Sequence, residues 1–300
     1  MKSTEFYALA EQFAPKSLSD EFCRRYGAYD NSGLLLDSGE EAEKILFSLD
    51  LSLAAIERAK REGAGIICTH HPAVYAKLGR LLSSEPASSG GKVAACLKAG
   101  ISVVSMHLNL DAAPCGIDES LMEGIILSAK SANEKSDVDG ENGKIPFGEK
   151  AASESEERFR QEGARPENIG IMQPLDGGGY GRAYDVPPVT AEALAAETEK
   201  TFCAKHIAVY GKRKEIRRAA SFCGAGADEE AVEFSVRQGA DVLVSSDFKH
   251  HVLTLALESG LSVIQLTHYA SENYGFEKYY RKIRRQAGIP CIFHTDEELL

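Results

Sequence analysis

Short apolar runs alternate along the chain with longer stretches in which apolar residues recur every three to four positions. The runs are KILFSLDLS (44–52), AGIICT (64–69), ISVVSM (101–106), HIAVYG (206–211), AASFCG (219–224), DVLVSS (241–246) and LSVIQL (261–266). Each is short and most are rich in β-branched residues, which is typical of buried strands. We therefore predict a strand at each run.

The stretches between these runs have the periodicity of amphipathic helices. They include LAAIERAKREG (53–63), GKVAACLKAG (91–100), DEEAVEFSVRQG (228–239) and HHVLTLALESG (250–260). Several end with a basic residue and then, two positions later, a glycine, which is a common helix stop signal. Alternation of strands and helices predicts an α/β protein with mostly parallel sheets.

The chain divides into three parts by composition. Residues 131–168 are charged, contain glycine and serine, and are almost free of β-branched residues, which favours a polar insertion or linker. Two interpretations are open for it: a solvated loop without a function, which its composition favours, or a helical segment at SESEERFRQEG (153–163). We therefore expect one α/β lobe at 1–130 and a second, similar lobe at 169–300.

The similarity of the lobes rests on an internal repeat. CLKAGISVVSMHLNLDAA (96–113) and ALESGLSVIQLTHYASEN (256–273) each contain a helix end, a glycine, a strand and then His-x-x-x-acid. Upstream, REGAGIICTHHP (61–72) and RQGADVLVSSDFKHH (237–251) each contain a strand followed by two adjacent histidines. The two halves therefore resemble copies of one helix-strand-helix-strand unit.

Six of the eight histidines follow these strands. The carboxyl ends of parallel strands line a common crevice, so the histidines and acids are expected to converge there. Imidazole and carboxylate groups together bind Zn, Fe, Mn, Co or Ni, and one carboxylate can bridge two ions. The predicted metal ligands are His70, His71, Asp111, His268 and Glu272.

The remaining histidines receive other interpretations. His250 and His251 have the placement of the repeat, but Asp247 could cap a helix that starts there, so a role behind the ligands or in substrate contact is equally open. His206 and His294 are set aside as ordinary polar residues.

Two glycine-rich segments lack the features of nucleotide loops. CGAGADEE (223–230) has an acid where a dinucleotide fingerprint needs its third glycine, so we predict a turn and a helix cap at Asp228. LDGGGYGRAYDVPP (175–188) lacks the Lys-Ser/Thr of a phosphate loop and predicts a flexible hairpin or lid, with Arg182 as an anion contact.

Composition narrows the function classes. With 34 basic and 45 acidic residues, the formal charge of -11 disfavours nucleic acid and anionic membranes and suits a metal ion. Seven scattered cysteines without a C-x-x-C pair indicate neither a disulfide framework nor a zinc ribbon. No apolar segment approaches the ~20 residues of a membrane span. We expect a soluble, cytoplasmic protein.

Five segments in this order carry a family resemblance. They are DNSGLLLD (30–37), THHP (69–72), HLNLDAAPCGID (107–118), SSDFKHH (245–251) and THYASE (267–272). Over nearly its whole length the chain resembles the NIF-three family of dinuclear-metal proteins, often labelled GTP cyclohydrolase 1 type 2. The resemblance implies two similar α/β lobes facing each other across a metal-binding cleft, and a toroidal homo-hexamer.

The same resemblance implies a site and an activity. Two divalent ions per chain would be held by His70, His71, Asp111, His268 and Glu272, with Glu272 touching both ions and His107 alongside. A metal-dependent hydrolase of the cyclohydrolase or phosphoesterase type, acting on a nucleotide or small molecule, is the expected function.

His250 or His107 is the predicted general acid or base, from placement alone. The alternative function is a non-catalytic metal-binding protein, either a metallochaperone or a ring-shaped interaction scaffold.

Overall fold

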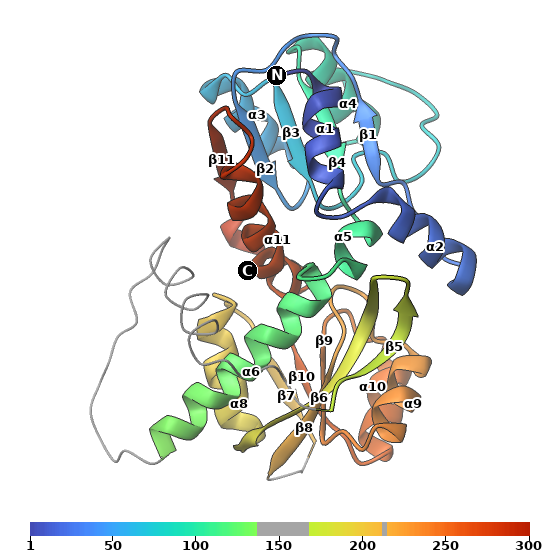
Figure 1. Cartoon of the computed structure of the whole chain (residues 1–300), viewed down its shortest axis with the longest axis vertical. Coiled ribbons are helices and arrows are strands. Elements are labelled where there is room, and N and C mark those ends of the chain that lie inside the picture. Colours follow the sequence, from blue (N-terminus) through green and yellow to red (C-terminus); the bar gives the residue numbers. More distant parts are fainter. Residues whose placement is uncertain (137–167, 212–214) are drawn as a thin grey trace. The chain divides into compact units, whose positions relative to one another are not determined.

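A computed structural model of the chain describes residues 1–136, 168–211 and 215–300 (Figure 1). Its first half contains α1 (Ser3–Glu11), α2 (Lys16–Tyr26), β1 (Gly33–Leu36), β2 (Ile45–Ser48), α3 (Leu53–Glu62), β3 (Ile66–Thr69), α4 (Ser89–Lys98), β4 (Ser102–Ser105), α5 (Leu108–Ala112) and α6 (Ile117–Ser136). Its second half contains β5 (Gly170–Leu175), β6 (Gly178–Val189), α8 (Ala191–Thr201), β7 (Ala208–Tyr210), β8 (Ile216–Ser221), α9 (Glu229–Arg237), β9 (Val242–Ser245), α10 (His250–Glu258), β10 (Ser262–Gln265), α11 (His268–Arg284), β11 (Cys291–His294) and the 3-10 helix η1 (Glu297–Leu299).

The predicted strands and helices are confirmed as elements. All seven apolar runs contain a strand, and the four amphipathic stretches correspond to α3, α4, α9 and α10. The sequence did not predict the strands β1, β5 and β11. The glycine-rich segment predicted as a hairpin or lid supplies most of β6, a strand that neighbours β5 and whose register with β8 shifts between Asp185 and Val189.

Contacts divide the chain into two compact units. Unit 1 comprises residues 1–120, 173–180 and 272–299, and unit 2 comprises residues 121–172, 181–271 and 300. The C-terminal strand β11 thus belongs to unit 1, where it pairs with β2. The lobe boundaries expected from composition, at 130 and 168, stay a prediction. Most of the expected insertion, including the helical segment at 153–163, lies outside the described residues.

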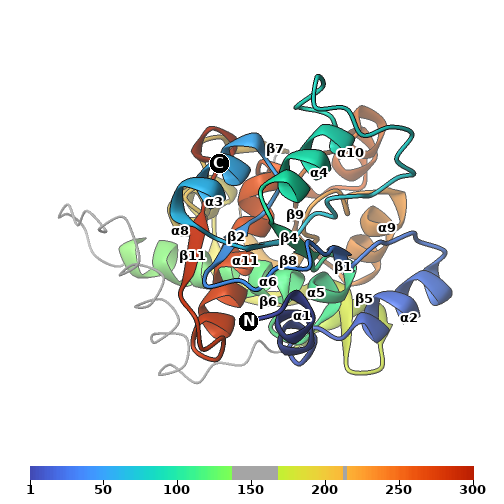
Figure 2. The same ribbon diagram turned by 90° about the horizontal axis from the view of Figure 1, so that it is seen from above.

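Unit 1 is built on a sheet with the strand order β1-β4-β3-β2-β11. β11, β2, β3 and β4 run parallel, while β1 pairs antiparallel with β4 at the edge. Successive side chains of a strand point to opposite faces. Leu46 accordingly packs with Ile56 and Ala59 of α3, whereas its neighbour Phe47 meets Phe6 of α1 at 6.0 Å between ring centroids. Helices therefore cover both faces (Figure 2).

Unit 2 contains most of the sheet β5-β6-β8-β9-β10-β7, apart from the part of β5 and β6 within residues 173–180. Only its centre is parallel, because β6 pairs antiparallel with β8 and β7 antiparallel with β10. The α/β class is confirmed. The first sheet is parallel except for β1 at one edge, and the second is parallel only at its centre. No helix in the described ranges has both the length and the apolar character that crossing a membrane requires.

Candidate metal centre

The end of β3 places two adjacent histidines in unit 1. After Thr69 the chain turns so that the backbone N–H groups of His70 and His71 both donate to the carbonyl of Leu49, at 3.1 and 3.0 Å. The Thr69 hydroxyl donates to the carbonyl of His71 at 2.8 Å, which secures the turn from the other side. The neighbouring imidazoles end with their ring centroids 4.9 Å apart.

His70 is fully buried and has one ring nitrogen without a hydrogen-bond partner. Its Nδ1 lies 2.8 Å from the Met106 carbonyl oxygen, which can only accept, so Nδ1 carries the proton. Its Nε2 has no hydrogen-bond partner among the described residues. The nearest acids are Asp111 Oδ1 at 3.4 Å and Glu272 Oε2 at 3.7 Å, beyond the usual length of an N–H···O bond.

Glu272 connects the two histidines. Its Oε2, 3.7 Å from His70 Nε2, lies 2.9 Å from Nε2 of His71. On the opposite side of the His71 ring, Nδ1 lies 2.8 Å from Asp50 Oδ1. His71 is thus held between two carboxylates, with its side chain 25% exposed, while the Glu272 side chain is only 4% exposed.

His107 precedes α5 and faces the same cluster. Its ring centroid lies 5.2 Å from that of His70 and 5.8 Å from that of His71. Nδ1 of His107 lies 2.8 Å from Asp30 Oδ1, and the other oxygen of Asp30 accepts from the hydroxyls of Ser19 and Ser32. The side chain of Asp30 is almost completely buried, so His107 is held in position by a carboxylate of the protein interior.

The electrostatics of the cluster follow from burial opposed by ion pairing. Burial lowers the pKa of His71, but Asp50 and Glu272 outweigh it and raise that pKa to about 10. Burial likewise lowers the pKa of His70, and Asp111 and Glu272 raise it above its ordinary value. For Asp50 and Asp30 burial raises the pKa, while hydrogen bonds from His71 and His107 respectively lower it below the usual range.

These positions fit a metal ion. Ligand atoms of His70, Asp111 and Glu272 lie within 4.8 Å of one another, as do those of His70, His71 and His107. In each of the three histidines an oxygen acceptor faces Nδ1, which leaves Nε2 directed at the cluster. Metal-binding histidines are commonly oriented in this way by a carboxylate or carbonyl oxygen. The buried carboxylates of Asp111 and Glu272 also favour a cation at this position.

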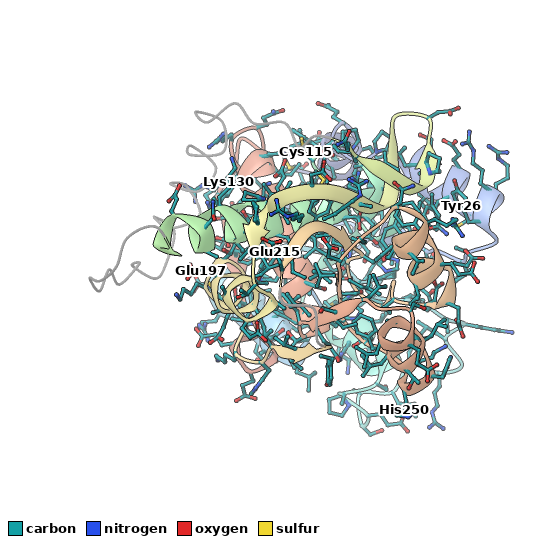
Figure 3. All side chains as sticks on the ribbon, turned by 90° about the horizontal axis from the view of Figure 1, so that it is seen from below. Tyr26, Cys115, Lys130, Glu197, Glu215 and His250 are labelled. Carbon is teal, nitrogen blue, oxygen red and sulfur yellow. The ribbon has the colours of Figure 1, made fainter. Side chains whose placement is uncertain are left out.

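The second copy of the repeat, in unit 2, is arranged differently. His268 begins α11, and its Nδ1 bonds to Asp247. His250 and His251 form the exposed first turn of α10 (Figure 3), where His251 Nε2 lies 2.9 Å from Glu229 Oε1. The prediction that Asp247 caps this helix is wrong, because Lys249 occupies the N-cap position. The cap predicted at Asp228 is confirmed by its bond from the Ala231 N–H at 2.8 Å.

Among the predicted site residues, the structure brings together His70, His71, His107, Asp111 and Glu272 in unit 1. Their roles, and those of His250 and His268 in unit 2, stay predictions. Sequence reasoning missed Asp50 and Asp30, which hold His71 and His107. Asp30 opens the segment DNSG, part of the family resemblance, so a signal for it existed, whereas Asp50 follows β2 without any distinctive pattern.

Known proteins resemble the chain over its full length. The family model described as Duf34/NIF3 (NGG1p interacting factor 3) matches residues 1–298. A Methanocaldococcus jannaschii protein named GTP cyclohydrolase 1 type 2 homolog is 28% identical over 295 residues, covering 93% of each chain. A Clostridium perfringens protein of the same name is 24% identical over 300 residues, covering 99% of this chain and 97% of the relative.

Solved structures share the fold. Reduced HcgD from Methanocaldococcus jannaschii has a TM-score of 0.69 and 24% identity, covering 98% of this chain and 97% of its own. Staphylococcus aureus hypothetical protein SA1388 has a TM-score of 0.72 and 22% identity, covering 99% and 97%. With the family model matching almost every residue, the chain belongs to the Duf34/NIF3 family.

Proposed function

We propose that the chain binds two divalent metal ions at the cluster of His70, His71, Asp111 and Glu272 and uses them to hydrolyse a small molecule of the nucleotide class. The observation that carries this proposal is the Nε2 atom of His70, fully buried, without a hydrogen-bond partner among the described residues and close to two carboxylates. A buried nitrogen without a hydrogen-bond partner costs free energy of folding unless it binds a ligand. The wider donor set of imidazoles and carboxylates suits Zn, Fe, Mn, Co or Ni.

The geometry of Glu272 supports two ions. One of its oxygens lies near the Nε2 atoms of both His70 and His71, so the carboxylate is placed to serve an ion at each. We assign His268 to the second ion, because it stands four residues before Glu272 on α11 and therefore shares its helix face. Asp247 holds the Nδ1 of His268 just as Asp50 holds that of His71.

The residues of the cluster are buried to different extents, which supports a catalytic metal site over a closed structural one. His70, Asp111 and Glu272 are buried, whereas the side chains of His71 and His107 are 25% and 18% exposed. Catalytic metal sites keep a position open to water or substrate, and structural sites do not. When bound, the ions would supply a Lewis acid that polarises the scissile bond and makes water a better nucleophile at neutral pH.

The protein's own residues then position and transfer protons. Met106 and Asp50 fix the tautomers of His70 and His71, so both present a lone pair on Nε2 once it is free of a proton. His107, held by Asp30, and His250 are the proposed general acid and base. The names of relatives in Methanocaldococcus and Clostridium support a nucleotide substrate. A homo-hexamer is proposed on family resemblance alone.

The test is hydrolysis by protein loaded in separate preparations with each candidate metal. GTP and other nucleotides are incubated with loaded and metal-free protein, and products are identified by chromatography and mass spectrometry. His250→Ala should abolish turnover and retain the metal, while His251→Ala, the matched exposed neighbour, should retain both. Fully loaded protein that hydrolyses no nucleotide would refute the hydrolase and leave the metallochaperone or scaffold.

A further inference from the structure

Two exposed tyrosines stand beside the histidine cluster in unit 1. Tyr29 is 60% exposed and Tyr75 is 49% exposed. Their ring centroids are 5.3 Å apart with the planes at 85°. Tyr75 also lies 6.1 Å from the ring of His107, at 86°. An aromatic pair therefore adjoins the proposed metal centre without being part of it.

The two loops that carry these rings are fastened together. The Tyr75 hydroxyl donates to the Tyr29 carbonyl at 3.2 Å, and the Asn31 amide donates to the carbonyl of Val74. Tyr29 directly precedes Asp30, which holds His107, and Tyr75 follows His71 by four residues. The rings are thus positioned by the same segments that position the histidines.

Perpendicular rings leave aromatic surface available. In a T-shaped pair the edge of one ring meets one face of the other, so the partner covers only one of the four faces. Both tyrosines are largely exposed, so the pair is open to a ligand from solvent. A planar ring can stack on such a face, and stacking of a base on an aromatic side chain contributes ~1–3 kcal/mol in single-stranded nucleic-acid complexes.

We propose that Tyr29 and Tyr75 form a stacking platform for the planar heteroaromatic ring of the substrate, which they hold beside the metal centre. This inference rests on the proposed function and deepens it by naming the residues that hold the base of a nucleotide-class substrate. Specificity would come from the ring, since stacking accepts any planar heterocycle but rejects a bare sugar phosphate.

The experiment compares guanosine 5′-monophosphate with ribose 5-phosphate as probes, using the full chain with and without metal. Titration calorimetry gives affinities, and NMR of the probe gives the upfield shift that stacked base protons acquire. The wild type should bind the nucleotide more tightly than the sugar phosphate. Tyr75→Leu should weaken nucleotide binding about 5- to 150-fold, the equivalent of one lost stack, and abolish the upfield shift.

Three controls separate the platform from other roles. Tyr75→Phe keeps the ring and loses only the hydroxyl bond to Tyr29, so it should bind the nucleotide nearly as the wild type does. Tyr26→Leu removes another tyrosine of unit 1, whose hydroxyl bonds to Pro174, and should leave binding unchanged. Metal content should be the same in all variants.

Results that contradict the stacking platform differ from those that contradict the proposed function. Equal nucleotide affinity and an unchanged base shift in Tyr75→Leu would overturn the platform, even if the metal and hydrolysis persist. A change of sedimentation coefficient in Tyr75→Leu without a change in nucleotide affinity would identify the pair as an interface between copies and also overturn it. Absence of metal from the wild type would instead refute the proposed function, and the base shift can still be read on metal-free protein.

Discussion

Unit 1 and unit 2 contain the same strand-helix-strand segment, β3-α4-β4 and β9-α10-β10, with different side chains at the strand ends. β3 and β4 run parallel with Thr69 opposite Ser105, and β9 and β10 run parallel with Ser245 opposite Gln265. The residue that follows β3 is His70, whereas the residue that follows β9 is Ser246, which is buried and bonds to the Gly224 carbonyl. The backbone is repeated, but the chemistry at that point is not.

A second position shows what the copies still share. His107 precedes α5 and His268 begins α11, and in each the Nδ1 atom bonds to an aspartate, Asp30 and Asp247 respectively. An oriented imidazole has therefore been kept in both copies, while the buried imidazole of His70 occurs in one. The comparison teaches that the repeat supplies the scaffold and that single residues at strand ends supply the site.

The largest expected effect on metal affinity comes from replacing by alanine the residue that follows the first strand of each copy. His70→Ala should lower metal affinity by more than the ~10–100-fold that loss of an orienting partner causes, because it removes a ligand. Ser246→Ala should leave metal binding unchanged. Competition with a fluorescent chelator measures both, and circular dichroism checks that each variant is folded. Equal affinities in the two variants would remove His70 from the centre.

Loss of an orienting carboxylate should have the next largest effect. Asp50→Asn should weaken metal binding ~10–100-fold, since Asn cannot hold His71 as a charged acceptor does. Asp247→Asn should do the same through His268 if both copies supply ligands. The matched control is Asp296→Asn, whose carboxylate pairs with His294 outside the cluster. An Asp50 variant that binds metal like this control would contradict the role of Asp50.

Metal binding should also release a measurable number of protons. The pKa of His71 in the metal-free protein is raised from 6.5 to about 10, so this imidazole is protonated at pH 8 and must lose about one proton when it binds metal. Titration calorimetry in buffers of different ionisation enthalpy counts the protons. No proton release at pH 8 would show that His71 is not displaced from its ion pairs.

The same raised pKa predicts how stability depends on pH. In the metal-free protein the ion pairs of protonated His71 contribute fully to stability below pH 6.5, the ordinary pKa. This contribution is lost as the pH rises through the folded-state pKa of about 10. The free energy of unfolding should therefore fall across that window. Denaturant titrations at several pH values test this, and His71→Gln should flatten the dependence. A wild-type stability that rises across the window would contradict the predicted sign.

The smallest expected effects are on stability, and they test whether the two units unfold separately. Ser52 caps α3 in unit 1, and Asp228 caps α9 in unit 2. Replacing either by alanine should lower the free energy of unfolding by about 1 kcal/mol. If the units unfold separately, each variant will shift a different transition in calorimetry; if they unfold together, both will shift one. An unchanged melting profile in both would contradict the assigned caps.

The sequence predicted the buried elements well because their signal is local. β3 and β9 are continuous apolar runs, and glycines after α3 and α9 mark where those helices end. β5 was missed since its residues are less regularly apolar: GIMQPL is half exposed and contains proline. β11 was missed because its place beside β2, about 240 residues earlier, is decided only by tertiary folding.

The candidate site was predicted in part for the same reason. The repeated His-x-x-x-acid pattern indicated His107, Asp111 and Glu272, which the structure brings together with His70 and His71. Two adjacent histidines occur in both halves, yet His70 directly follows its strand while His250 begins a helix. Four residues, 246–249, separate β9 from His250, whereas no residue separates β3 from His70, and local periodicity does not show what that spacing does. Asp50 was missed because its contact with His71 depends on strand pairing.

Metal content per chain tests the central claim most directly. Mass spectrometry is applied to protein purified without chelator or nickel resin, beside Glu272→Ala and the control Glu229→Ala, which removes an acid paired with a histidine elsewhere. The account predicts two equivalents of divalent metal in the wild type and the control, and a sharp fall in Glu272→Ala. A wild type that carries no metal even after anaerobic loading would contradict it.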